Sequence, residues 1–593
     1  MSEKIQTVSK LSRRQTVEVK AGQVGIGGNN PVRIQTMVTT PTSNIAATVE
    51  ACMKVADVGA ELVRITAPTI KDAEALGLIR QELRAKGYSI PLIADIHFNP
   101  DVAEIAAKNV EKIRINPGNF TDKQAILQPE DVADFEQRWN DDLVKLRTRF
   151  VALLNVCKEY TTALRIGSNH GSLSGRIMSK YGNTPAGMVE SAMEFLRICK
   201  DENFNNVVVS MKASNTKIMV QAYRLLVAAM DAEDMHYPLH LGVTEAGDGE
   251  DGRIKSAVGI GSLLADGLGD TIRVSLTEAP ENEIPVAKEI VRYLASGNSG
   301  ISECIRFDYS NQKSGRTSLL GNEVVVISDL SKLNPVTASD IESLGSKPDC
   351  PQKNPVPEYI YTGSSRFDAD NDNPKIIHDS NNNFIFCNCS KFDTSFLAWL
   401  RENQNKALVV SFDNAVSITE RRSFFLDLQR NGIVNPVIIA LSYSELDFEK
   451  LQIMAACDFG ALLIDGFGDG IMLSAEPCIS PKLVADLCFR ILQAARVRYT
   501  RTEYIACPGC GRTLFDLQDT LKKVKAATSQ FNNLKIGIMG CIVNGPGEMV
   551  DADYGYVGSG PGKITLYKGK EVVKKNIPQQ NAIEELIELI KKG

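Results

Sequence analysis

Eight short apolar runs, rich in β-branched residues, recur through the first 295 residues and alternate with longer stretches of helical periodicity. Nearly continuous apolar strands that alternate with helices are typical of parallel sheets buried on both faces. Eight such units in this length predict a (β/α)8 TIM barrel, with an open doubly wound sheet as the competing interpretation. The runs begin at Val32, Ala60, Pro91, Glu111, Ala163, Asn206, Pro238 and Asp270.

Charged and polar side chains are concentrated where these runs end. Because the carboxyl ends of barrel strands converge on one face, we expect these side chains to line one basin. A charge held in a strand is costly unless a counter-ion meets it, and Asp95 and Glu245 cannot neutralise five cations. The surplus positive charge favours binding of an anion with several charges, such as a diphosphate, over ion pairs among the strand-end residues alone. The candidate residues are Arg64, Asp95, His97, Arg114, Asn116, Arg165, Asn169, Lys212, Glu245, Arg273 and Ser275.

The chain beyond the eight runs divides into two further regions. Residues 296–322 have the composition of a linker, and residues 345–376 are predicted to form long surface loops. Four more runs (EVVVISDL, ALVVSFDN, PVIIALSYS and GALLIDGFGDGIML) are candidates for buried strands. The segment LLIDGFGDGIMLS at Leu462 echoes LLADGLGDTIRVS at Leu263, but Met472 stands where the first copy has Arg273. If the echo reflects a duplication, the middle region is a degenerate, barrel-like copy with a structural role.

The predicted domains are therefore a substrate-binding barrel over 1–295, an inserted middle domain over 296–499 and a small α/β domain over 500–593. In the last domain, KIGIMG and ITLYKG are expected to form strands. The segment IEELIELIKK has its apolar residues on one helical face.

Composition excludes several classes of protein. The 593 residues are 43% hydrophobic and 23% charged with a net charge of −6, which excludes a largely disordered chain and argues against a nucleic-acid coat or a basic membrane-surface protein. The chain has no stretch of about 18 apolar residues, so no membrane span is predicted. Thirteen cysteines, an odd number, in a chain without a secretory signal indicate a reducing compartment, so we expect a cytoplasmic protein.

Three cysteines beyond residue 500 form a separate pattern. Cys507 and Cys510 lie in ACPGCGR, and Cys541 lies in GIMGCIVNGPGEM. A zinc site built from thiolates would need a fourth cysteine, and a thioredoxin-type pair would need no third. Three cysteines fit a cubane iron–sulfur cluster that leaves one iron without a thiolate, and Glu548 is a candidate carboxylate for that iron. Zinc and redox thiols remain alternatives at this point.

Four motifs together give a specific resemblance. CPGCGR, MGCIVNGPGEM, HLGVTEAG and GDTIRVSLT, in the regions 1–295 and 500–593, resemble 4-hydroxy-3-methylbut-2-enyl diphosphate synthase. This family is the iron–sulfur reductase of the methylerythritol phosphate route to isoprenoids. The inserted middle region resembles the long, three-domain form of the family.

The resemblance implies a reaction and a set of roles. The family opens the ring of 2-C-methyl-D-erythritol 2,4-cyclodiphosphate by reduction and removes a hydroxyl as water. By motif, Cys507, Cys510, Cys541 and Glu548 match its [4Fe-4S] ligands, and Glu245 matches its acid/base carboxylate. Its diphosphate-binding cations match Arg64, Arg114, Arg165, Lys212 and Arg273, with Asn116, Asn169 and Ser275 as polar partners; Asp95 and His97 match its ADIHF motif.

The resemblance leaves the partners open. Reduced ferredoxin and reduced flavodoxin are both compatible with an acidic enzyme as electron donor, and no nucleic acid or membrane is expected. The short form of the family is a homodimer in which one chain's barrel meets the other's cluster domain. The insert here allows either that arrangement or a site built from one chain.

Two other functions compete with this one. Lys212 at the end of a barrel strand suits a Schiff-base aldolase or lyase acting on a phosphorylated substrate. A non-enzymatic, zinc-stabilised scaffold that binds an anionic metabolite is the other alternative. Trapping with borohydride tests the first, and metal content tests the second.

Overall fold

The N-terminal part of the chain is a parallel barrel. The computed structural model describes residues 5–6, 13–96, 99–120, 135–296, 306–307, 320–333, 335–344, 355–363, 375–378, 383–531, 533–542 and 545–593. Within them the sheet order β10-β11-β4-β5-β6-β7-β8-β9 is closed by a parallel bridge between Val209 and Leu239. The predicted TIM barrel is therefore confirmed, and every predicted run contributes a strand. The strands are β4 Arg33–Met37, β5 Leu62–Thr66, β6 Leu92–Asp95, β7 Lys112–Ile115, β8 Ala163–Asn169, β9 Val207–Lys212, β10 His240–Leu241 and β11 Thr271–Ile272.

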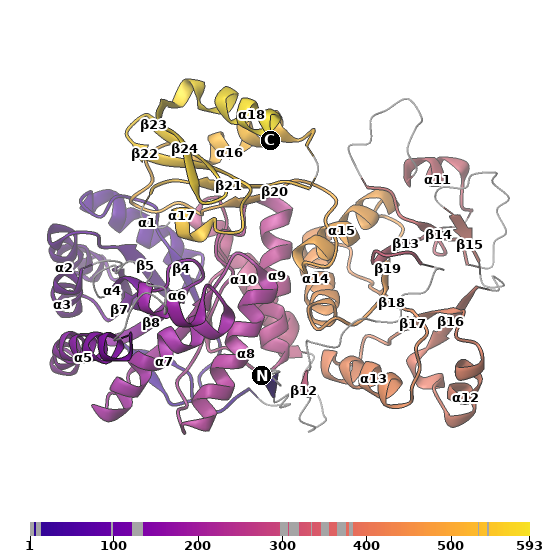
Figure 1. The fold of residues 1–593 in the computed structure, drawn as a ribbon, viewed down its shortest axis with the longest axis horizontal. Helices are drawn as coiled ribbons and strands as arrows, with labels where there is room; N and C mark the ends of the chain where they lie inside the picture. Colours follow the sequence, from indigo (N-terminus) through magenta and orange to yellow (C-terminus); the bar gives the residue numbers. More distant parts are fainter. Residues whose placement is uncertain are drawn as a thin grey trace.

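A long helix follows each barrel strand and packs on the outside of the barrel (Figure 1). Many helices begin at side-chain caps: Thr69 forms a capping box with Asp72 before α2, and Asn215 accepts two backbone N–H groups of α8. The helices are α1 Ile45–Asp57, α2 Ile70–Ala85, α3 Pro100–Asn109, α5 Phe135–Glu159, α7 Pro185–Asp201, α8 Thr216–Ala232, α9 Gly249–Ala265 and α10 Glu283–Ser296.

The middle of the chain forms a curled, open parallel sheet in the order β15-β14-β13-β19-β18-β17-β16. This matches the expected barrel-like insert. The loops predicted within 345–376 contain two short strands, and GALLI of the fourth strand candidate is the end of helix α14 rather than part of a strand. The elements are β13 Val325–Asp329, α11 Ala338–Leu344, β14 Tyr359–Tyr361, β15 Lys375–Ile377, β16 Phe384–Asn388, α12 Thr394–Glu402, β17 Ala407–Ser411, α13 Ile418–Arg430, β18 Val437–Ser442, α14 Phe448–Ile464, β19 Gly470–Ser474 and α15 Pro481–Ala494.

The barrel and the middle sheet meet through α9 and α14, which pack side by side (Figure 1). Glycines allow the close approach, since a Cβ on Gly261 would lie 2.7 Å from Cys457 Sγ. At the ends of these helices, Asp266 and Asp465, the equivalent positions of the sequence echo, both contact two buried arginines. Arg224 bonds Asp266 at 2.8 Å and Asp465 at 2.6 Å, and Arg422 bonds the same two carboxylates at 2.7 Å each. The echo thus marks equivalent elements in a pseudo-symmetric interface.

The C-terminal residues form a five-stranded sheet that lies over the carboxyl end of the barrel of the same chain (Figure 1). Its three parallel strands are followed by an antiparallel hairpin. A parallel bridge between Ala246 and Ala506 joins the barrel to this sheet. The elements are β20 Glu503–Ala506, α16 Leu517–Thr528, β21 Lys535–Met539, α17 Gly545–Glu548, β22 Tyr554–Gly560, β23 Lys563–Lys568, β24 Glu571–Pro578 and α18 Ala582–Lys592.

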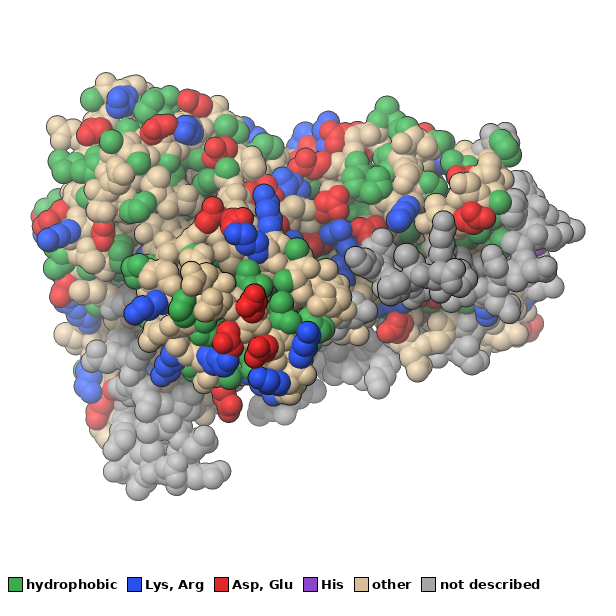
Figure 2. Space-filling model, turned by 90° about the horizontal axis from the view of Figure 1, so that it is seen from above, with side chains coloured by type: hydrophobic (Ala, Val, Ile, Leu, Met, Phe, Trp, Pro, Cys, Tyr) green, Lys and Arg blue, Asp and Glu red, His purple; other side chains and the backbone are tan. Residues whose placement is uncertain are grey.

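The surface carries both signs of charge. On the face drawn in Figure 2, basic and acidic side chains are interspersed over the described residues and give a phosphate backbone no continuous basic track. Among the described residues, no helix combines the length and apolar character needed to cross a bilayer.

A buried ion-pair cluster fixes the junction of the three parts. Glu503, at the start of β20, bonds Lys255 of α9 at 2.7 Å and Arg496, which follows α15, at 2.7 Å. Burial alone would raise the pKa of Glu503, but the two cations lower it to about 2. The carboxylate therefore stabilises the fold above the unfolded-state pKa of about 4.3, and this contribution is lost as the pH falls toward 2.

We expect Glu503→Gln to lower the free energy of unfolding by about 3 kcal/mol, because it leaves two buried cations uncompensated. Urea unfolding of the metal-free chain at neutral pH measures the change. Glu50→Gln removes an exposed partner of Lys54 and is the matched control, with little change expected. Equal effects of the two substitutions would contradict a structural role for the junction.

Candidate active site

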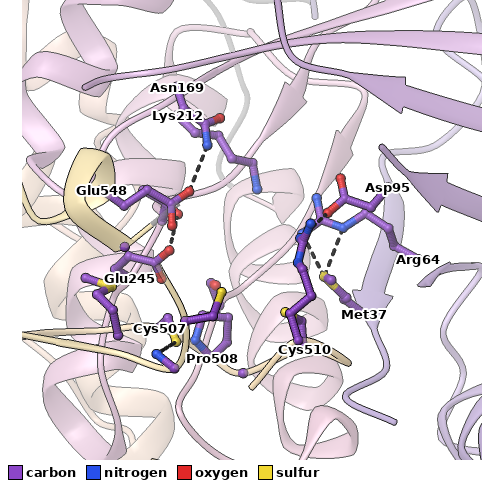
Figure 3. Close-up of a pocket in the computed structure, with 18 of the residues that line it drawn as sticks. Met37, Arg64, Asp95, Asn169, Lys212, Glu245, Cys507, Pro508, Cys510 and Glu548 are labelled. Atoms are coloured by element: carbon purple, nitrogen blue, oxygen red, sulfur yellow. Dashed lines mark hydrogen bonds and ion pairs between the residues drawn. The ribbon is translucent and has the colours of Figure 1, made fainter. Parts of the chain in front are cut away.

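A cavity lies between the carboxyl ends of the barrel strands and the C-terminal sheet. Figure 3 shows side chains from both parts pointing into it. The position agrees with the general location of TIM-barrel active sites. From the sequence-predicted set it is lined by Arg64, Asp95, Arg114, Arg165, Asn169, Lys212, Glu245, Arg273, Ser275, Cys507, Cys510, Cys541 and Glu548.

Of the other two predicted residues, the described one, Asn116, is not among the cavity walls. Asn116 is buried beside the cavity, where its Oδ1 accepts the backbone N–H of Gly118. Its placement there gives no direct support for the predicted substrate contact. His97 lies outside the described residues. Sequence reasoning did not select Met37, Thr244 or Arg512, which also line the cavity, although Arg512 ends the quoted CPGCGR motif.

The cations of the cavity differ in their partners. Arg114 pairs with Asp95 at 3.3 Å, and Arg273 pairs with Glu283 at 2.9 Å. Glu283 begins α10 outside the cavity and was not anticipated. Ion pairs within the protein therefore neutralise part of the basic set. One of the two carboxylates involved, Glu283, does not come from a strand end.

Three cations retain uncompensated charge. Among the described residues, no carboxylate lies within ion-pair distance of Arg64, Arg165 or Lys212. Arg64 instead donates to Met37 Sδ, and two buried nitrogens of Arg165 have no acceptor in the described part of the chain. Burial and neighbouring cations lower the pKa of Arg165 and of Lys212 well below their ordinary values. A bound anion would remove this penalty by charge-assisted hydrogen bonds.

Glu245 and Glu548 face each other across the junction (Figure 3). Glu245 has a φ of 51°, which is rare for a residue with a side chain and marks a locally strained backbone. Glu548 accepts a 2.8 Å hydrogen bond from Asn169 Nδ2. Burial raises the pKa of Glu548 well above its ordinary value, and the Glu245 carboxyl adds to the increase. In the metal-free chain, burial and the nearby Glu245 carboxyl therefore favour the protonated form of Glu548 by raising its pKa.

The three thiols come from two loops of the C-terminal sheet. Cys507 and Cys510 follow β20, and Cys541 follows β21. Gly540 N–H donates to Cys507 Sγ at 3.2 Å, and burial raises the pKa of the Cys507 thiol well above its ordinary value. Among the described residues, no three potential ligands converge on a point that would hold a single metal ion. A cubane binds each ligand through a different iron atom, so three thiols and one carboxylate spread around one cavity fit that group.

Two glycines bring the barrel and the C-terminal sheet into backbone contact beside Glu548. A Cβ on Gly171, which has a φ of 82°, would lie 2.0 Å from the carbonyl oxygen of Gly547. Gly547 belongs to α17, the short helix that ends at Glu548. The close packing therefore places the Glu548 carboxylate against Asn169.

We expect Gly171→Ala to displace α17 and to lower kcat/KM by about 10²-fold, because displacements of about 1 Å at an active site have effects of this size. Steady-state kinetics measures the change. Gly249→Ala is the matched control, since Gly249 has a φ of 55° but no atom within 4 Å of an added Cβ. An equal loss of kcat/KM in the two variants would show that backbone strain, and not the contact with Gly547, causes the effect.

Comparisons with known proteins match the two parts of the chain that enclose the cavity. The GcpE TIM-barrel domain model matches residues 16–288, and the GcpE C-terminal domain model matches residues 503–592. The fold and the site thus define a GcpE-type protein, with a barrel covered by the family's C-terminal domain.

Three proteins that are similar to this chain over nearly its whole length share one name. The chain is 48% identical to the 4-hydroxy-3-methylbut-2-en-1-yl diphosphate synthase (flavodoxin) of Phocaeicola vulgatus, over 98% of each chain. Proteins of the same name from Porphyromonas gingivalis (44% identity, 98% of each chain) and Leptospira interrogans (39%, over 99% of this chain and 97% of the relative) are also similar. This chain belongs to the 4-hydroxy-3-methylbut-2-en-1-yl diphosphate synthase family, as the four motifs predicted.

Proposed function

We propose that the chain converts 2-C-methyl-D-erythritol 2,4-cyclodiphosphate to 4-hydroxy-3-methylbut-2-enyl diphosphate by reduction at a [4Fe-4S] cluster. The observation that carries the proposal is one cavity that combines uncompensated barrel cations with three thiols and a carboxylate. Membership of the synthase family supports the same reaction. The product keeps both phosphates, so the cations that bind the substrate also bind the product.

The basic wall of the cavity is the proposed diphosphate site. Arg64, Arg165 and Lys212 supply positive charge and have no ion-pair partner among the described carboxylates. Arg114 and Arg273 are held in place by Asp95 and Glu283, and they add donors in fixed orientations. Asn169 and Ser275 are the proposed polar partners. Asn116 and His97 remain predicted contacts.

The opposite wall is the proposed cluster site, with Cys507, Cys510, Cys541 and Glu548 as ligands. When bound, a [4Fe-4S] cluster supplies electrons one at a time for cleavage of a carbon–oxygen bond. The N–H of Gly540 is placed to stabilise the Cys507 thiolate. Asn169 is placed to orient the Glu548 carboxylate, which would be a more labile ligand of a bound cluster than a thiolate.

Glu245 is the proposed proton donor. Its Oε2 has no hydrogen-bond donor among the described residues, and it faces the Glu548 carboxyl. A proton held on this oxygen can pass to the hydroxyl that leaves as water. The C-terminal sheet covers the barrel mouth and keeps bulk water from the reacting atoms.

Reduced flavodoxin is the proposed electron donor. The relatives reported above carry flavodoxin in their names. Reduced ferredoxin is the alternative donor, and a comparison of turnover with the two purified proteins distinguishes them.

The test is product analysis with the chain purified without oxygen. With reduced flavodoxin and the cyclic diphosphate, we expect the linear allylic diphosphate as the only new diphosphate. Lys212, with its lowered pKa, also suits a Schiff-base lyase. A product that forms without reductant, together with borohydride labelling of Lys212, would replace the reductive function with that one.

A further inference from the structure

Arg512 connects the two walls of the cavity. It ends the loop that carries Cys507 and Cys510, and its side chain is 11% exposed. Its Nη2 lies 3.5 Å from Asp95 Oδ2, at the end of β6 in the barrel. The other oxygen of Asp95 contacts Arg114 at 3.3 Å, so one carboxylate bridges a barrel arginine and a C-terminal arginine.

The same guanidinium lies beside the thiols. Arg512, Cys510 and Cys541 all line the cavity, and Arg512 is close enough to both sulfurs for their charges to act on it. Its Nε is buried and has no acceptor among the described residues. Cys510 and Asp95 lie on one side of the cavity, and Glu245 and Glu548 lie on the other (Figure 3). Arg512 is therefore a nearly buried positive charge between a proposed cluster ligand and the substrate side.

We propose that Arg512 is a positioning residue that holds the cysteine loop against the barrel and raises the reduction potential of the bound cluster. Addition of an electron makes a cluster more negative, and a fixed positive charge at short range in a poorly solvated site favours the reduced form. Asp95 opposes this effect because it partly neutralises the guanidinium. The inference rests on the proposed function, since it assumes a cluster at Cys507, Cys510 and Cys541.

The test is a redox titration of the chain, followed by electron paramagnetic resonance, with no substrate present. Arg512→Gln is expected to make the midpoint potential more negative, with about a tenfold smaller equilibrium constant for reduction. Arg512→Lys keeps the charge and should retain most of the potential, but it should raise KM because it lacks the planar fork that reaches Asp95. Asp95→Asn should shift the potential in the opposite direction.

Arg64→Gln is the matched control, since it removes a cavity cation that contacts Met37 rather than a thiol. It should weaken substrate binding and leave the potential near that of the wild type. If Arg512→Gln does not bind a cluster, the midpoint potential of Asp95→Asn tests the proposal, which predicts a positive shift. An unchanged potential in both Arg512→Gln and Asp95→Asn, or equal shifts in Arg512→Gln and Arg64→Gln, would overturn the proposal. A wild-type chain that binds no cluster would instead refute the proposed function.

Discussion

Glu245→Gln is expected to lower kcat by about 10³-fold while the chain still binds its cluster and its substrate. General acid catalysis contributes about 10²- to 10⁴-fold, and glutamine keeps the shape of the side chain but cannot donate an acidic proton. Glu245 makes no ion pair among the described residues, so the basic wall should bind the diphosphate as before. Turnover, iron content and substrate affinity are measured on the same preparation.

Glu250→Gln is the control for Glu245→Gln. Glu250 lies five residues along the chain, outside the cavity walls, and contacts Arg490 at 3.4 Å. It should leave kcat unchanged. A normal kcat in Glu245→Gln would remove Glu245 as the proton donor, whereas loss of the cluster in that variant would show that its main role is to support Glu548.

Cys541→Ser is expected to abolish turnover and to remove nearly all the bound iron and sulfide. A cubane held by three thiolates and one carboxylate has no spare ligand, and serine is a poor ligand for iron at neutral pH. Cys541 is the only cysteine of the described residues after β21, so its own loop offers no second thiol to replace it. Iron, sulfide and the visible absorption spectrum provide the measurement.

Cys478→Ser is the control for Cys541→Ser, because Cys478 is exposed in the middle of the chain and lies outside the cavity. Its iron content should equal that of the wild type. Full iron and sulfide in Cys541→Ser would exclude Cys541 as a ligand. Another side chain would then have to take its place at the cluster.

The barrel and most of its site residues could be predicted from sequence because the same pattern encodes both. A strand buried on both faces is apolar until it reaches the mouth, and there the polar residues begin. Lys212, the last residue of β9, follows this rule, whereas Arg64 lies within β5 and precedes the apolar Ile65. Resemblance to the family added the roles of these residues, which periodicity alone does not give.

Other features could not be predicted because they depend on contacts between distant parts of the chain. Glu283 neutralises Arg273 from the start of α10, and no strand-end pattern indicates it. Helix α14 is apolar on all sides because it packs between α9 and the middle sheet, so a short apolar run there cannot be assigned to a helix or a strand by its period. Asn116 ends its run like its neighbours, yet its side chain caps a turn beside the cavity.

The arrangement of the three parts was also left open by the sequence. The C-terminal sheet covers the barrel of its own chain, so one chain brings the proposed cluster ligands to the proposed diphosphate site. Contacts from both sides, including Asn169 with Glu548 and Asp95 with Arg512, support this closed form. The middle sheet packs against the barrel through the Arg224 and Arg422 ion pairs, away from the cavity.

The most direct test of the central claim is the content of iron and acid-labile sulfide per chain after purification without oxygen. The account predicts about four of each, as expected for a single cubane. Zinc in place of iron, with no sulfide, would contradict the reductive mechanism and would favour a zinc-stabilised protein that binds an anionic metabolite.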